Sequence, residues 1–309
     1  MLKEIKITDI PGFQIGCMEN PTAMTGCTVF LSDKGALCGA DVRGGAPASR
    51  ENALLNPLAS NDAVNAVVLS GGSAFGLSSA DGVMKYLEER NIGFPTADGV
   101  VPIVCASCLY DLSIGDKTVR PDSAMGYQAC INAEKNLFRE GSYGAGCGAT
   151  IGKVRGMKYA MKAGQASYAC QLGDLMVGAF VALNAVGDVF NPENGQKIAG
   201  MHHPETMEWI SAEEALYSLA DPDLFHQNTT IGVILTNANL SKSDLTKVSG
   251  MAHDGYARCI RPVHTMFDGD TIYTLSTRSV KADVNIVGTL AAAVMEKAIL
   301  KAAKPDKLF

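Results

Sequence analysis

Residues 228–238, Asn-Thr-Thr-Ile-Gly-Val-Ile-Leu-Thr-Asn-Ala, join two hydroxyl side chains to an apolar run. If the bond between Asn228 and Thr229 were cut, Thr229 would carry both a nucleophilic hydroxyl and a free α-amine. An α-amine has a reference pKa near ~8, so it can act as a general base at neutral pH. The pattern therefore raises the hypothesis of a chain that cleaves itself and uses Thr229 as its catalytic N-terminus.

The same residues also fit a structural role, because hydroxyl side chains before a strand often cap a turn. The residues at 231–235 are mostly β-branched or apolar, and residues 237–241 supply a stop. A buried strand is therefore predicted after Thr229 under either interpretation.

Two carboxylates late in the chain, Asp268 and Asp270, flank Gly269. On a strand this spacing puts both on one face, and in a turn both can converge on one cation, such as a protonated α-amine. A solvated turn and a weak calcium loop are the alternatives.

Apolar patterning indicates the elements that must position these residues. Strands are expected at residues 25–31, 36–42, 63–69, 100–112, 231–235 and 273–276, the first two as a hairpin around a turn at 33–35. Helices are expected at 77–87, 123–139 and 243–260 and at the C-terminus, where Asp283 is the predicted N-cap. The elements do not alternate strictly, which favours α+β layers over a doubly wound parallel sheet.

Residues 191–228 differ in character, with Asn-Pro, Asn-Gly, His-His-Pro and Asp-Pro turns around one helical piece near 209–219. We interpret this stretch as a linker that ends at the proposed scissile bond. Exposed, poorly tied backbone is where a cut is tolerated.

The composition is that of a well-cored globular protein, with 309 residues, 47% hydrophobic and 19% charged. A net charge of −6 argues against nucleic acid as a partner. No apolar run approaches the ~20 residues of a membrane span, and no signal-peptide core is present at the N-terminus. Nine scattered cysteines fit reduced thiols and a cytoplasmic location.

Several familiar motifs nearly fit and fail. Residues 72–76, Gly-Ser-Ala-Phe-Gly, have one residue too many after the serine for the nucleophile elbow of hydrolases. The glycines at 144–149 do not follow an apolar strand, and the phosphate-loop pattern would need glycine at Cys147 and a hydroxyl residue at Val154. Cys105 and Cys108 have C-x-x-C spacing without a second pair. Neither a cofactor nor a metal is expected.

Read together, five blocks resemble the L-aminopeptidase/D-esterase family of N-terminal-nucleophile hydrolases, which includes β-peptidyl aminopeptidases and nylon-oligomer hydrolases. They run in order over most of the chain, at residues 69–83, 144–153, 184–188, 228–233 and 261–270. The resemblance implies a four-layer αββα sandwich of α+β class, formed by one domain over 1–309. It also implies one self-cleavage into chains 1–228 and 229–309 that stay associated, and a tendency to form homotetramers.

The resemblance also assigns roles. Thr229 matches the nucleophile, Asp268 and Asp270 the acidic partners of its amine, and Asn184 the oxyanion-hole residue. Lys153 matches a lysine near the nucleophile of nylon-oligomer hydrolases. A turn residue at 184 and a solvated lysine at 153 are the structural alternatives.

Three further residues bear on specificity. Tyr110 matches a substrate-contacting aromatic of the nylon branch, although tyrosines more often pack in a core. Cys147 stands where a small hydroxyl residue is usual, and the segment around Tyr110 departs from the family pattern. His264 lies in the matched block, and we expect it to be structural.

The implied function is hydrolysis of amide or ester bonds in small peptides or amino-acid derivatives, through an acyl-enzyme on Thr229. A nylon-oligomer amidohydrolase, an acyltransferase of the ornithine acetyltransferase type and an uncut, non-enzymatic homologue are the alternatives. The substrate, its stereochemistry and the oligomeric state stay open.

Overall fold

A computed structural model describes residues 1–218 and 228–304. Ten strands of this part of the chain form one hydrogen-bonded sheet, which bends at the long strand β3 (Thr25–Val42). On one side of the bend lies the layer that we call the first face. It continues from the second half of β3 through β17 (Thr271–Lys281), β15 (Thr229–Asn239), β12 (Leu175–Asn184), β11 (Gln165–Leu172) and β1 (Leu2–Ile5). The second face pairs the first half of β3 with β2 (Gln14–Asn20) and β5 (Val64–Ser70), followed by β8 (Val104–Cys108) and β4 (Ala48–Arg50).

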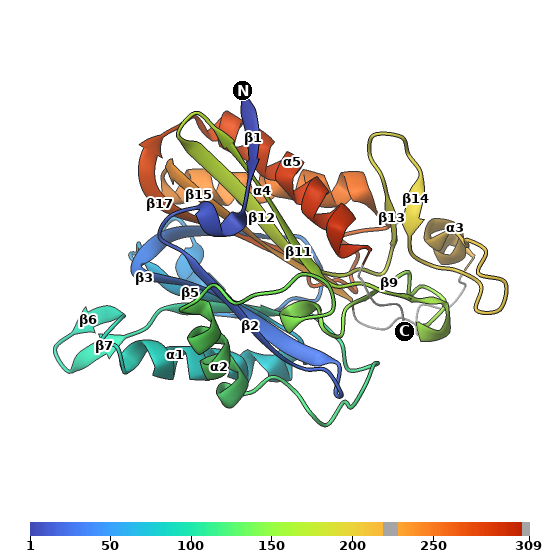
Figure 1. Ribbon diagram of the computed structural model, residues 1–309, viewed down its shortest axis with the longest axis horizontal. Coiled ribbons are helices and arrows are strands. Elements are labelled where there is room, and N and C mark those ends of the chain that lie inside the picture. Colours follow the sequence, from blue (N-terminus) through green and yellow to red (C-terminus); the bar gives the residue numbers. More distant parts are fainter. Residues whose placement is uncertain (219–227, 305–309) are drawn as a thin grey trace.

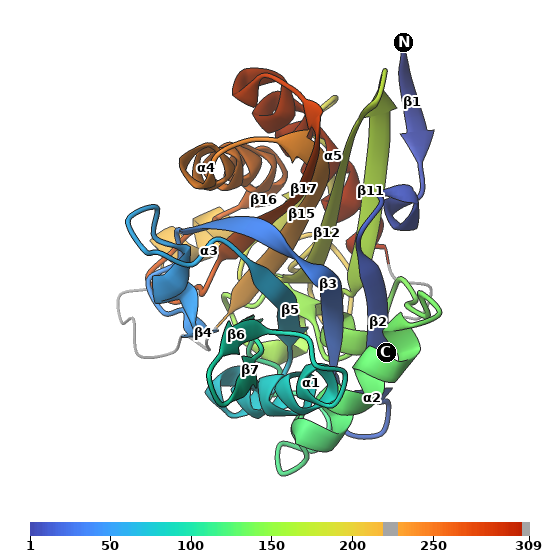
Figure 2. The ribbon, with the colours of Figure 1, turned by 90° about the vertical axis from the view of Figure 1, so that its left-hand side faces the viewer.

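Helices cover the outer side of each face, as Figures 1 and 2 show. On the first face lie α4 (Lys242–Cys259) and α5 (Val284–Ala302), and on the second lie α1 (Ser79–Glu88) and α2 (Ser123–Ala133). A short helix, α3 (Ala212–Tyr217), lies apart from these layers. Short ladders are formed by β6 (Phe94–Thr96) with β7 (Gly99–Val101), β9 (Thr150–Ile151) with β10 (Met161–Lys162), and β13 (Asp188–Phe190) with β14 (Lys197–Ala199) and β16 (Ile260–Arg261). The expected αββα sandwich is thus confirmed.

Three apolar layers hold the sandwich together. Between the sheets, the rings of Phe30 and Phe180 meet edge to face with centroids 5.0 Å apart. Outside them, α4 and α5 pack on the first face and α1 and α2 on the second. Strand β15 is buried on both sides, since Val233 faces the inter-sheet layer and Ile234 the helices. This explains why its sequence is continuously apolar rather than alternating.

The predicted hairpin at 25–42 is wrong. Residues 25–31 and 36–42 belong to one strand, whose register shifts between Leu31 and Ala36. Its first half pairs with β2 and β5, and its second half pairs with β17. Gly35, with φ of +74°, does not end a hairpin turn but lies at the irregularity between the two halves of this strand.

Other boundaries differ in detail. The strand expected at 100–112 is interrupted at Pro102 and forms β7 and β8, and the helix expected at 123–139 ends at Ala133. Asp283 caps α5 as predicted, its side chain accepting from the backbone N–H of Asn285. Two β-α-β units are present, because β15 pairs parallel to β17 and β5 parallel to β8.

The first part of the stretch interpreted as a linker is held to the rest of the protein by contacts with Asp188. The buried Asp188 carboxylate accepts from the N–H groups of Met201 and Ala212 and pairs with Lys197 at 2.8 Å. Residues 219–227, the part nearest the proposed cut, lie outside the described residues.

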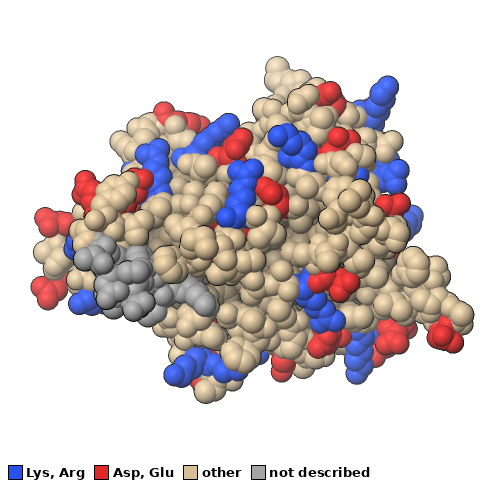
Figure 3. All heavy atoms as spheres, turned by 180° about the vertical axis from the view of Figure 1, so that it is seen from behind, with Lys and Arg blue, Asp and Glu red and all other residues tan. Residues whose placement is uncertain are grey.

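Surface charge follows the composition. Figure 3 shows one face on which basic and acidic side chains are interspersed among its described residues. Within the described ranges, no helix has the length and apolarity needed to cross a membrane.

Contact between α4 and β3 fixes one side of the sheet that carries Thr229. We predict that Gly39→Ala lowers the free energy of unfolding by about 1–3 kcal/mol, because a Cβ there would lie 2.3 Å from the backbone nitrogen of Thr246. Gly250→Ala is the matched control, since its Cβ would meet only side-chain ends at 3.3 Å or more. Urea unfolding measures both, and equal midpoints for Gly39→Ala and wild type would contradict this packing.

Candidate active site

Three separate segments meet at the start of β15. Strand β12 runs antiparallel to β15, so its last residue, Asn184, stands opposite Thr229. Strand β17 runs parallel to β15 and begins at Thr271, so the preceding residues 268–270 lie beside 228–230. The topology therefore brings the predicted site residues from three parts of the chain to one end of the sheet.

The proposed scissile bond is held by backbone hydrogen bonds. The N–H of Asn228 donates to the carbonyl of Phe267 at 3.0 Å, and the N–H of Gly269 donates to the carbonyl of Asn228 at 3.1 Å. The Thr229 hydroxyl donates to this same Asn228 carbonyl. Thr229 is only 4% exposed, so this contact between its hydroxyl and the carbonyl it would attack is shielded from bulk water.

Gly269 also lies in the candidate site, although its sequence pattern indicates only a turn. A Cβ at this position would lie 2.8 Å from the Thr229 Oγ and 3.0 Å from the carbonyl oxygen of Ala46. Only glycine lets the backbone approach this closely, and its N–H donates to the Asn228 carbonyl oxygen, on which negative charge would develop if Thr229 attacked. The signal in the sequence was the glycine between two aspartates.

Asn184 organises the opposite side of the site. Its side-chain oxygen accepts from the Lys153 ammonium at 2.7 Å and from the N–H of Thr150 at 3.0 Å. Its amide nitrogen donates to the carbonyl of Tyr110 at 2.9 Å. One proton of this amide is left for a further acceptor, because an Asn side chain carries two.

The two aspartates are buried and held by different donors. Asp268 accepts from the N–H of Thr265 at 2.8 Å and from its hydroxyl at 2.6 Å. Asp270 accepts from the N–H of Thr230 at 2.7 Å through one oxygen, and from His264 through the other. In the uncut chain Asp270 therefore holds the residue after Thr229, and its contact with a Thr229 amine stays a prediction.

Burial shifts the pKa values of Lys153 and Asp268. Loss of hydration lowers the pKa of Lys153 to about 7, against the opposing attraction of Asp268. Loss of hydration, together with repulsion from Asp270, raises the pKa of Asp268 to about 7. Because both groups titrate near neutrality, proton transfer at either of them costs little free energy at pH 7.

The remaining predicted residues are placed less directly. Tyr110 is half-buried and reaches the site through its backbone carbonyl. Cys105 and Cys147 are buried, and burial raises the pKa of each thiol to about 12, so neither is a thiolate at neutral pH. Among the described residues no cluster of three His, Cys, Asp or Glu side chains could hold a metal ion.

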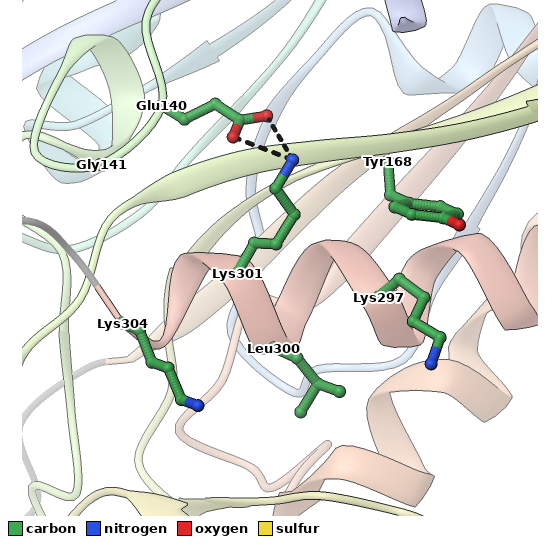
Figure 4. A pocket seen from close by; sticks show the side chains of 7 residues that line it. All are labelled: Glu140, Gly141, Tyr168, Lys297, Leu300, Lys301 and Lys304. Carbon is green, nitrogen blue, oxygen red and sulfur yellow. Dashed lines mark hydrogen bonds and ion pairs between the residues drawn. The ribbon is translucent and has the colours of Figure 1, made fainter. Parts of the chain in front are cut away.

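A large surface hollow of about 480 Å³ lies elsewhere, between α5 and β11. It is lined by lysines, yet Lys301 is paired with Glu140 at 3.0 Å, as Figure 4 shows, and Lys297 is paired with Glu193 at 2.7 Å. None of its lining residues belongs to the candidate site around Thr229.

Solved structures define the class of the fold. The chain superposes on the L-aminopeptidase D-Ala-esterase/amidase of Ochrobactrum anthropi, a variant of the Ntn-hydrolase fold, with a TM-score of 0.70 and 17% identity, covering 96% of this chain and 85% of the other. It also superposes on a β-aminopeptidase of Burkholderia sp., with a TM-score of 0.68 and 19% identity over 96% and 85% of the two chains. The fold is therefore that of the Ntn hydrolases.

Sequence comparison gives the family. The profile of Peptidase family S58 matches residues 6–305, so the chain belongs to this family and is a hydrolase of amide bonds. It is 40% identical to an uncharacterized aminopeptidase of Mycobacterium leprae, over 89% of this chain and 79% of the relative. It is 30% identical to a 6-aminohexanoate-oligomer endohydrolase of Agromyces sp., over 98% and 87% of the two chains.

The shifted pKa values predict opposite effects on stability. An unfolded lysine titrates near ~10.4, so between pH 7 and about 10 the unfolded chain binds a proton that folded Lys153 lacks, and the free energy of unfolding rises with pH. An unfolded aspartate titrates near ~3.9, so between about pH 4 and 7 folded Asp268 holds the extra proton, and the free energy falls with rising pH.

Urea unfolding between pH 4 and 10 tests both signs. Lys153→Met should remove the rise above pH 7, and Asp268→Asn should remove the fall below it. A Lys153→Met variant whose stability follows the same pH curve as wild type would show that Lys153 is not buried as described.

Proposed function

We propose that the chain is a self-processing hydrolase that cuts itself between Asn228 and Thr229 and then uses Thr229 as an N-terminal nucleophile. One observation carries the proposal: the Thr229 hydroxyl lies against the carbonyl of Asn228, which the N–H of Gly269 already holds. The hydroxyl is thus adjacent to the carbonyl that it would attack, and the Gly269 N–H is in place as a donor for the developing oxyanion.

In maturation, the Thr229 oxygen bonds to the Asn228 carbonyl carbon and the peptide C–N bond breaks. The hydroxyl proton ends on the departing Thr229 nitrogen, which becomes the α-amine. A group that titrates near neutrality is suited to carry this proton, and the pKa values of Lys153 and Asp268, both about 7, make these two the candidates. The resulting ester is hydrolysed by water, which leaves a carboxylate on Asn228 and a free Thr229.

In turnover, the Thr229 amine takes the hydroxyl proton while the oxygen attacks the substrate carbonyl. The N–H of Gly269 and the remaining amide proton of Asn184 are the donors for the oxyanion, and removing one such donor typically costs about 3 kcal/mol of transition-state stabilisation. The protonated amine, held by Asp268 or Asp270, then gives its proton to the leaving amine. Water releases the acyl group from Thr229.

The backbone around Asn228 indicates which acyl groups fit. Asn228 is the first acyl group seated in the site, and its N–H donates to the Phe267 carbonyl. The amine of an α-aminoacyl substrate would take this position, which supports an aminopeptidase. Relatives named 6-aminohexanoate-oligomer endohydrolases favour a second candidate, cleavage of nylon-type amides, in which the amine is several carbons from the carbonyl.

The proposal extends to the assembly of the two chains. We expect residues 1–228 and 229–309 to stay associated after the cut, as parts of a homo-oligomer, of which the homotetramer is the expected form, in the cytoplasm. Tyr110 stays a predicted substrate contact.

Substitution at the nucleophile tests the mechanism. Thr229→Ala should give a folded, uncut chain without hydrolase activity, because no hydroxyl remains to attack. Thr229→Ser, which keeps the hydroxyl, should still be cut and active. A denaturing gel and release of p-nitroaniline from an amino-acid p-nitroanilide measure the two properties, and hydrolysis by Thr229→Ala at the wild-type rate would refute the mechanism.

A substrate series tests the acyl site. Alanine p-nitroanilide should have a kcat/KM roughly 10-fold or more above those of propionyl and 6-aminohexanoyl p-nitroanilide, since the latter two leave the Phe267 carbonyl unpaired, at a cost of about 1–3 kcal/mol. Preference for the 6-aminohexanoyl compound would instead establish the nylon-type candidate.

A further inference from the structure

His264 is tied to the candidate site by two hydrogen bonds to one oxygen. Both its backbone N–H, at 3.2 Å, and its ring Nδ1, at 2.8 Å, meet the same carboxylate oxygen of Asp270. The other oxygen of Asp270 accepts from the N–H of Thr230 at 2.7 Å. Asp270 is therefore a bridge between His264 and the residue that follows the proposed nucleophile.

The ring of His264 is held in one orientation by α4. It lies edge to face against His253, with centroids 4.8 Å apart, and stacks on Tyr256 at 5.9 Å with an interplanar angle of 24°. His253 and Tyr256 are fully buried, and His253 is in turn bonded to the backbone carbonyl of Asp41 at 3.1 Å. The imidazole of His264 thus has little freedom to turn away from Asp270.

The chemistry of the pair fixes which ring nitrogen carries the proton. An ionised carboxylate only accepts hydrogen bonds, so Nδ1 of His264 must be the donor. Its Nε2 is then left buried, and within the described residues it has no hydrogen-bond partner. A side chain present only for packing would not need a buried nitrogen of this kind, which indicates that the Nδ1–H is what the position requires.

The backbone of His264 is also constrained. Its φ of +59° lies in the left-handed region, which residues other than glycine adopt uncommonly and in which asparagine, aspartate and histidine are enriched. This conformation is what lets the backbone N–H and the ring of one residue reach the same carboxylate oxygen.

We propose that His264 is a positioning residue: by donating from Nδ1 it fixes the Asp270 carboxylate against the N–H of Thr230, and so fixes the strand end that presents Thr229. The inference rests on the proposed function and adds to it the group that holds Asp270 in place. His264 itself is bonded to Asp270 and not to the scissile peptide, so its effect passes through Asp270.

Two variants separate the donor from the packing. His264→Asn keeps an N–H close to the position of Nδ1 and tolerates the left-handed backbone, but it lacks the ring. His264→Phe keeps the backbone N–H and a ring between His253 and Tyr256, but it has no side-chain donor and tolerates the left-handed backbone less well.

We expect His264→Asn to cleave itself and turn over within about 3-fold of wild type. We expect His264→Phe to be slowed on the order of 10- to 100-fold in self-cleavage and in kcat per cut chain, with KM nearly unchanged, because misplacing a reacting group by about 1 Å has effects of this size. Wild-type rates for His264→Phe, or equal losses in both variants, would overturn the inference.

Nitrogen-15 NMR of the wild-type imidazoles gives a second test that is independent of how the phenylalanine variant folds. His264 should be the Nδ1–H tautomer, and an Nε2–H tautomer would overturn the inference. The outcomes also separate this inference from the proposed function. An active Thr229→Ala chain would remove the mechanism and leave the tautomer unaffected, whereas rapid self-cleavage of His264→Phe in a protein that does cut at Thr229 would remove only the role of His264.

Discussion

The pairing of β15 with a neighbour on each side is the constraint on which the site depends. Strand β12 sets Asn184 opposite Thr229, and the segment before β17 sets Gly269 against the carbonyl of Asn228. A slip of one residue would turn Thr229 towards the helices and bring Thr230 into its place, because side chains alternate along a strand. The two buried apolar faces of β15 make such a slip costly, so the core fixes the position of the Thr229 hydroxyl.

Burial that secures this register also sets the electrostatics. Lys153, Asp268 and Asp270 are each 5% exposed or less, so none is stabilised by bulk water. The result for Lys153 and Asp268 is a pKa near neutrality for both, which weakens the folded state and suits proton transfer. The backbone amides of Gly269 and Thr230 and the side chain of His264 contact the surrounding acceptors, so that the donors would need little rearrangement in the proposed reaction.

Local patterns predicted part of this account from the sequence. The apolar run after Thr229 and the periodic helices at 243–260 and at the C-terminus are local signals, and resemblance to a family supplied the four layers and the roles of Asn184 and Lys153. Features created by distant pairing were missed. Nothing near residue 35 shows that β3 continues from one layer of strands into the other. The position of Gly269 beside Asn228 depends on the bridge between Asn228 and Asp268, which are 40 residues apart in the sequence. The pKa of Lys153 likewise follows from burial that only the folded chain creates.

Intact mass spectrometry of the purified wild-type protein tests the central claim most directly. The account predicts two chains, the smaller beginning at Thr229, whose masses add up to 32.5 kDa plus one water. Partial cleavage that goes to completion as the sample ages would give the same result. A single uncut chain in folded protein that nevertheless hydrolyses amides would contradict it, because Thr229 would then have no free amine with which to act.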